Sequence, residues 1–170
     1  MSDVAEEHRH AAGQRVAGCA VLTVSDTRTA DTDAGGKLLR EALAGAGHRL
    51  LAHDLVRDEP DLVRTRLETW LADPGIQLVL TTGGTGIAPR DTTIEVVEAL
   101  LDKRLDGFGE LFRMLSYEQV GSAAMLSRAT AGLAGETFVF ALPGSTKALR
   151  LALDRLILPE IPHLLWQRGG

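Results

Sequence analysis

The middle of the chain contains an apolar run that leads directly into a glycine-rich segment, Ile76-Gln77-Leu78-Val79-Leu80-Thr81-Thr82-Gly83-Gly84-Thr85-Gly86. Residues 76–80 have the length and composition of a buried strand, and the glycines that follow are typical of a tight turn into a helix. A helical pattern begins near Thr92. The order of strand, glycine-rich turn and helix predicts one unit of an α/β protein.

Units of the same kind are predicted on both sides of this segment. Strands are expected at 18–24, 50–56 and 137–142, and a further short, antiparallel strand is considered at 129–134. Helical patterns occupy about 37–46, 60–71 and 146–157, an irregular one covers 106–121, and a long polar loop covers 25–36. Because strands alternate with helices, we expect an α/β fold with a mostly parallel sheet.

Composition limits the class of protein. A chain of 170 residues fits one domain, for which we expect residues 16–170, preceded by a mobile tail at 1–15 that is polar and aperiodic. The single cysteine, Cys19, excludes an intrachain disulfide, and neither a signal peptide nor an apolar segment of bilayer length is visible. The formal charge of −5 argues against a nucleic-acid partner. We therefore expect a cytoplasmic protein without membrane or nucleic-acid contacts.

Polar residues follow each predicted strand of the sheet. In a sheet of this class, ligands bind beyond the carboxyl ends of the strands. The residues expected there, in chain order, are Ser25, Asp26, Asp58, Thr82, Gly83, Gly84, Thr85, Gly86, Asp91, Pro143, Gly144, Ser145 and Lys147.

The glycine run suits anionic oxygens. Glycines leave backbone N–H groups unscreened, and the hydroxyls of Thr82 and Thr85 add donors, so phosphate is the expected ligand. The alternative is a tight turn that binds nothing. Pro89 stands where a dinucleotide fingerprint needs its third glycine, and no lysine follows the run as in a Walker loop.

Lys147 and Ser145 have two readings each. A lysine in the first turn of a helix is disfavoured by the macrodipole, by about 0.3–1 kcal/mol at exposed sites, unless an anion is bound there as well. Lys147 is therefore either a phosphate ligand or a solvated surface residue. Ser145 serves equally well as a helix cap or as a phosphate ligand.

Two aspartates are candidates for catalysis and for Mg²⁺. Thr92 and Glu95 fit a capping box, which leaves Asp91 one position outside it and free for another role. Asp58 is either the cap of the helix that begins near Pro60 or a functional carboxylate. If Asp58 and Asp91 face one crevice, they provide a Mg²⁺ site for a nucleotide.

Taken together, several motifs resemble the molybdopterin-binding family of molybdenum cofactor biosynthesis, over roughly residues 17–159. The matching segments are 81–86 with Arg90-Asp91, Gly107-Phe108-Gly109-Glu110, Ser127-Arg128 and 143–147. The resemblance implies a three-layer α/β/α sandwich that forms a homotrimer or homohexamer, with other proteins of the pathway as further partners. Residues 143–148 are more similar to the protein B branch of the family than to its adenylyltransferase branch.

The resemblance also implies a reaction. In it the terminal phosphate of molybdopterin attacks the α-phosphorus of ATP with Mg²⁺ present, and pyrophosphate leaves. Asp58 and Asp91 would be the catalytic, Mg²⁺-binding pair. The nucleotide phosphates would be bound by residues 82–86, with Ser25 and Asp26. The pterin side would comprise Glu110, Arg113, Ser116, Pro143, Gly144, Ser145 and Lys147. Glu110 and Arg113 also fit a surface ion pair on a helix.

Two competing functions remain open. One is a molybdopterin carrier or scaffold without turnover, and the other is a nucleotide-sugar or pyridine-nucleotide hydrolase of related fold. Replacing either aspartate separates the carrier from the enzyme, and a dinucleotide screen tests for the hydrolase.

Overall fold

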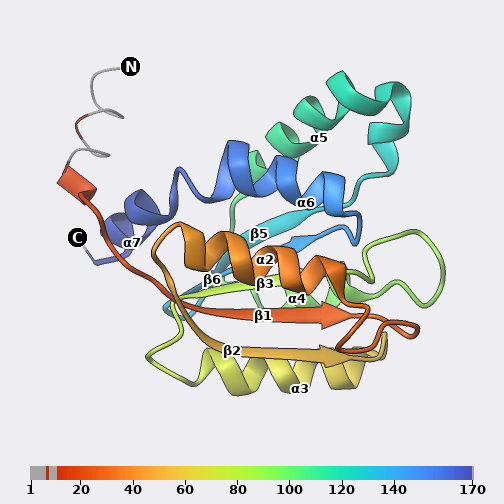
Figure 1. The fold of residues 1–170 in the computed structure, drawn as a ribbon, viewed down its shortest axis with the longest axis horizontal. Helices are drawn as coiled ribbons and strands as arrows, with labels where there is room; N and C mark the ends of the chain where they lie inside the picture. Colours follow the sequence, from red (N-terminus) through yellow and green to blue (C-terminus); the bar gives the residue numbers. More distant parts are fainter. Residues whose placement is uncertain (1–6, 8–10, 170) are drawn as a thin grey trace.

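The computed structural model describes residue 7 and residues 11–169, and it contains one six-stranded sheet (Figure 1). The strand order is β2-β1-β3-β6-β5-β4. Strands β2, β1, β3 and β6 are parallel, and β5 and β4 are antiparallel to their neighbours. The bounds are β1 Gly18–Val24, β2 Arg49–Val56, β3 Leu78–Thr82, β4 Lys103–Arg104, β5 Thr130–Ala134 and β6 Thr137–Leu142.

Helices cover both faces of the sheet, which makes a three-layer α/β/α sandwich (Figure 1). Helices α3 (Pro60–Leu71) and α4 (Thr93–Leu100) pack on one face. The other face carries α2 (Ala34–Gly45), α5 (Asp106–Val120), α6 (Thr146–Ala152) and α7 (Ile161–Gly169). The remaining elements are a 3₁₀ helix, η1 (Gly121–Leu126), and a short π helix, η2 (Leu153–Ile157).

The alternation of side chains along β1 explains the two cores. Cys19 and Val21 point into the core beneath α2, α5 and α6, whereas Ala20 and Leu22 point into the core beneath α3 and α4. All seven residues of β1 are buried. A strand buried on both faces reads as a continuous apolar run, which is why the sequence predicted it with the observed bounds.

Several boundaries differ from the sequence prediction. Strand β3 lies two residues later than expected, because Thr81 and Thr82 pair with both β1 and β6. Helix α2 begins at Ala34, inside the predicted loop 25–36, where the Asp33 side chain accepts a hydrogen bond from the Gly36 N–H at 2.8 Å. The sequence analysis missed β4, η1 and α7, while the short strand at 130–134 is present and antiparallel.

The predicted capping box of α4 is not formed. Thr92 is the N-cap residue, but its side chain makes no capping hydrogen bond. Glu95 instead forms an ion pair with Arg128, which comes from the segment before β5. The pattern was correct for the start of the helix and wrong for the partner of Glu95, since a distant arginine competes for that carboxylate.

Candidate functional site

The strand order brings the ends of four parallel strands to one edge of the sheet. From β1 the chain moves outward to β2, then crosses back to β3, so the direction of connection changes between β1 and β3. Such a switch point is where open α/β sheets bind ligands. A cavity of about 210 Å³ lies there, and its lining includes Ser25, Arg28, Gly35, Thr82, Gly83, Gly144 and Thr146.

The glycine-rich loop is held tightly against β1 and β6. Gly83 has φ +95°, and its N–H donates to the Leu142 carbonyl at 3.1 Å. A Cβ at Gly83 would lie 2.1 Å from the Val24 carbonyl oxygen, so no larger residue fits without movement of the backbone. The Thr82 hydroxyl donates to the Pro143 carbonyl at 3.1 Å. The end of β3 therefore forms the floor of the cavity.

Two of the predicted functional residues, Asp58 and Asp91, lie beside the same loop. A Cβ at Gly84 would lie 2.9 Å from Asp58 Oδ2, and a Cβ at Gly86 would lie 2.6 Å from Asp91 Oδ2. The Asp91 Oδ2 atom accepts the Ala88 N–H at 2.8 Å. The structure thus brings both aspartates to the glycine run, as the Mg²⁺ hypothesis requires.

Buried polar atoms near Asp58 have no protein partner. Asp58 is 9% exposed, and its Oδ1 atom makes no hydrogen bond to any residue that the structure describes. The hydroxyls of Thr92 and Thr93 are also buried without a hydrogen-bond partner among the described residues. Thr93 Oγ1 lies 2.2 Å from the position that a Cβ at Gly84 would occupy. Buried polar atoms are normally satisfied, so these three groups beside the glycine-rich loop are available to a water molecule or a ligand.

The electrostatic environment of Asp58 favours a cation beside its carboxylate. Burial raises the pKa of the Asp58 carboxyl above its usual value, and the charges of Asp91 and Asp26 raise it further. A hydrogen bond from the Thr92 N–H and the charge of Arg90 act in the opposite direction. A carboxylate whose negative charge is disfavoured in the free protein gains from a nearby cation.

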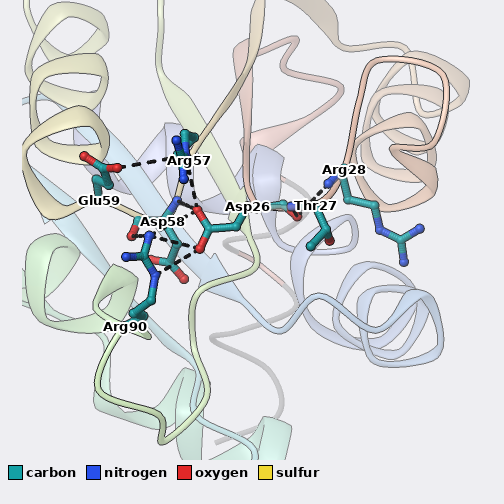
Figure 2. Close-up of polar contacts among 8 residues, drawn as sticks. Asp26, Thr27, Arg28, Arg57, Asp58, Glu59 and Arg90 are labelled. Carbon is teal, nitrogen blue, oxygen red and sulfur yellow. Dashed lines mark hydrogen bonds and ion pairs between the residues drawn. The ribbon is translucent and has the colours of Figure 1, made fainter.

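Asp26 is engaged by two arginines (Figure 2). Arg90 Nε donates to Asp26 Oδ2 at 3.0 Å and its Nη2 donates to Oδ1 at 3.2 Å, while Arg57 Nε lies 3.6 Å from Oδ1. The hydrogen bond from Arg90 is the main reason that the pKa of Asp26 is lowered. The Arg28 guanidinium points away from this group in Figure 2. The predicted role of Asp26 as a phosphate ligand stays a prediction, and its oxygens already have cationic partners.

The predicted pterin-side residues divide into two groups. Gly144 lines the switch-point cavity, Ser145 Oγ accepts the Ala148 N–H at 3.5 Å as the cap of α6, and Lys147 is exposed. Pro143 precedes them at the end of β6. This group lies beside the glycine-rich loop.

The second group lies on α5. Glu110 and Arg113 line a separate cavity of about 380 Å³ between α4, α5 and the start of β5. No ion pair joins the two among residues 11–169. The Ser116 hydroxyl donates to the Phe112 carbonyl at 2.7 Å inside the helix. Within one chain, the structure does not place this group in the cavity that contains Gly144.

Two arginines of the site received no role from the sequence. Arg90 joins Asp26 to the Asp58 backbone, and Arg128 donates to the Gly86 carbonyl at 2.9 Å and pairs with Glu95. Both occur in the motifs that carry the family resemblance. Their partners are more than 30 residues away along the chain, so local spacing offered no signal.

The carboxylates of the site suit Mg²⁺ only when a substrate supplies some of its other ligands. The described residues contain no group of three or more His, Cys, Asp or Glu able to hold a metal ion by themselves. Mg²⁺ is commonly bound by one or two carboxylates, with waters and substrate phosphates as its other ligands. Asp58 and Asp91, with the unsatisfied Asp58 Oδ1, fit that pattern.

A mostly parallel sheet with a glycine-rich loop and two carboxylates at the strand ends defines an α/β protein with a candidate ligand site at the switch point. The model of a probable molybdopterin binding domain matches residues 20–163. The chain therefore belongs to the molybdopterin-binding family of molybdenum cofactor biosynthesis proteins.

Individual relatives agree with this assignment. Molybdenum cofactor biosynthesis protein B of Bacillus cereus is 48% identical over 162 residues, which cover 95% of each chain. A crystal structure of a molybdenum cofactor biosynthesis protein B is 47% identical, with a TM-score of 0.89 over 92% of this chain and 98% of that one. The tungsten cofactor synthesizing protein MoaB of Pyrococcus furiosus is 38% identical, with a TM-score of 0.82 over 92% and 99%. Both the α/β/α fold and the family predicted from the sequence are confirmed.

The described helices also bear on membrane contact. Within residues 11–169, no helix combines the length and the apolar character that crossing a bilayer requires.

Proposed function

We propose that this member of the molybdenum cofactor biosynthesis family binds molybdopterin and adenylylates it with Mg-ATP. The observation that carries the proposal is the pair Asp58 and Asp91 beside the glycine-rich loop, one of them with a buried, unsatisfied oxygen. Family membership supports the pathway and the pterin. The nucleotide, Mg²⁺ and the cytoplasmic location stay predictions.

In the proposed reaction, an oxygen of the pterin's terminal phosphate attacks the α-phosphorus of ATP. The new P–O bond forms as the bond from the α-phosphorus to the bridging oxygen of the β-phosphate breaks, and pyrophosphate leaves. The chain's contribution is positioning and charge stabilisation, as in phosphoryl transfer generally. Mg²⁺, when bound, would neutralise charge on the phosphates.

Named residues would share this work. Backbone N–H groups at Gly84 and Gly86 would donate to nucleotide phosphates, because glycine leaves them accessible. Asp58 and Asp91 would hold Mg²⁺. Lys147, exposed at the first turn of α6 and next in sequence to Thr146 of the switch-point cavity, would bind the pterin phosphate.

The test is a turnover assay with molybdopterin, ATP and Mg²⁺, in which pyrophosphate and adenylylated molybdopterin are measured. We expect turnover by the wild-type protein and a loss of at least about 100-fold in kcat for Asp58→Asn and Asp91→Asn. Asp61→Asn is the matched control, because Asp61 is close in sequence but exposed on α3. Absence of pyrophosphate from the wild-type reaction would reject the proposal.

A molybdopterin carrier is the second candidate. Two of the relatives reported above are named protein B and the third is a tungsten cofactor synthesizing protein MoaB, and none of these names states an adenylyltransferase activity. A carrier would bind molybdopterin without releasing pyrophosphate, and Asp58→Asn would leave its pterin affinity unchanged. Equilibrium binding in the absence of ATP measures that affinity directly.

A homo-oligomer is part of the same proposal. Helix α5 lies at the rim of the molecule, and its outer side carries three exposed apolar residues one turn apart, Leu111, Met114 and Tyr117 (Figure 1). Met125 on η1 is also exposed, at 79%. Exposed apolar patches of this kind are typical of subunit contacts. Light scattering of the wild type and of Met114→Glu tests this; a monomeric wild type would contradict it.

A further inference from the structure

One arginine joins the three loops that follow β1, β2 and β3 (Figure 2). Arg90, from the β3–α4 loop, donates to both carboxylate oxygens of Asp26, which lies after β1. Its Nη2 also donates to the Asp58 carbonyl, after β2, at 3.2 Å. Because these strands are neighbours in the sheet, the contacts join the loops at the carboxyl ends of all three strands.

The same group fixes the Asp58 backbone on both sides. The Asp58 N–H donates to Asp26 Oδ1 at 3.2 Å, and the Asp58 carbonyl accepts from Arg90. Asp58 is thus held at its N–H and at its carbonyl by the two members of one ion pair. Its side chain, by contrast, has an oxygen without a protein partner. The Thr92 N–H also donates to this carboxylate, so the backbone contacts with Asp26 and Arg90 orient it together with that hydrogen bond.

We propose that Asp26 and Arg90 are positioning residues that hold the Asp58 carboxylate against the glycine-rich loop. This inference rests on the proposed adenylyl transfer. It gives Asp26 a role that acts through Asp58, in place of the phosphate contact expected from the sequence.

Arg57 supplies a matched control. It approaches the same Asp26 oxygen, at 3.6 Å, but its only other ion-pair partner among the described residues is Glu59, at 3.9 Å. No hydrogen bond joins the Arg57 side chain to the Asp58 backbone within residues 11–169. Arg57→Gln therefore removes a cation near Asp26 without releasing Asp58.

The experiment measures kcat, the KM for ATP and the urea midpoint for Asp26→Asn, Arg90→Gln, the double variant and Arg57→Gln. A displacement of about 1 Å in a reacting group can cost about 100-fold in rate. We expect each of the first two variants to lose about 100-fold in kcat with KM changed less than about threefold. The double variant should lose no more than the worse single variant, because the two residues act as one unit.

A conservative variant separates geometry from charge. Arg90→Lys retains the positive charge but lacks the planar fork that contacts Asp26 and the Asp58 carbonyl together. We expect its kcat to stay within about tenfold of that of Arg90→Gln. Full recovery in Arg90→Lys would show that charge alone matters and would overturn the positioning role.

Other outcomes are equally decisive. The inference is overturned if Asp26→Asn and Arg90→Gln have the same kcat as Arg57→Gln. It is also overturned if these two variants change only the KM for ATP. A third contrary result is a loss of kcat that is accompanied by a matching fall in the urea midpoint, absent from Arg57→Gln. If Arg90→Gln does not fold, Asp26→Asn and Arg90→Lys decide the question. A wild-type protein without turnover refutes the proposed function and removes the positioning role with it, whereas normal wild-type turnover with unaffected variants refutes the positioning role alone.

Discussion

Gly83→Ala should destabilise the fold strongly, for two reasons that the structure separates. Gly83 has φ +95°, where an L-residue costs about 1–2 kcal/mol. Its new Cβ would also lie 2.1 Å from the Val24 carbonyl oxygen, so β1 and the end of β3 must move apart by about 1 Å. Overpacking of this kind typically costs about 1–3 kcal/mol. The expected loss is therefore about 2–5 kcal/mol, a large part of the stability of an ordinary domain.

Urea unfolding followed by far-UV circular dichroism measures this loss. With an m-value of about 2–3 kcal/mol/M, the midpoint should fall by about 0.7–2.5 M. Protein concentration must be held constant, since self-association would shift the midpoint. Gly144→Ala is the control on the other side of the cavity, because its Cβ would lie 3.7 Å from the Gly83 Cα, an ordinary contact. Equal midpoints for the two variants would refute the steric argument.

Three further predictions concern side chains. Burial and neighbouring acids raise the pKa of Asp58, so the ionised carboxylate lowers the stability of the fold. Without divalent cations, Asp58→Asn should therefore raise the free energy of unfolding at pH 7. That gain should vanish as the pH falls below the ordinary pKa of 3.8. Burial raises the pKa of the Cys19 thiol to about 12, so a thiol reagent at pH 8 should modify it only in unfolded protein, as mass spectrometry will show. Asp33 caps α2 and accepts from the Thr23 hydroxyl at 2.7 Å, so Asp33→Ala should cost about 2 kcal/mol in urea unfolding while Asp31→Ala stays within about 0.5 kcal/mol. The first prediction is contradicted if the stability gain of Asp58→Asn persists at pH 3, and the second if native Cys19 is labelled rapidly. Equal losses of stability in Asp33→Ala and Asp31→Ala would contradict the third.

The elements that the sequence predicted well are those whose burial is continuous. Strands β1 and β6 have the predicted bounds, because every residue in them is buried and the apolar run ends where the strand ends. Strand β4 was missed because it has two residues, both exposed, and no pattern of its own. The apolar run ends at Leu80, so the sequence predicted the end of β3 there, yet Thr81 and Thr82 are both buried in β3.

For the candidate site, the sequence predicted the glycine run and the two aspartates, since glycines and acids after a buried strand are a local signal. The tertiary structure alone decided what each acid contacts. Asp58 is buried with an unsatisfied oxygen, whereas Asp26 is paired with Arg90, 64 residues away. It also decided that Glu110 and Arg113 line a different cavity from Gly144. The physical reason is that side-chain periodicity reports burial along one segment, while contacts between loops depend on which strands become neighbours, and the order β2-β1-β3-β6 exists only once the sheet has formed.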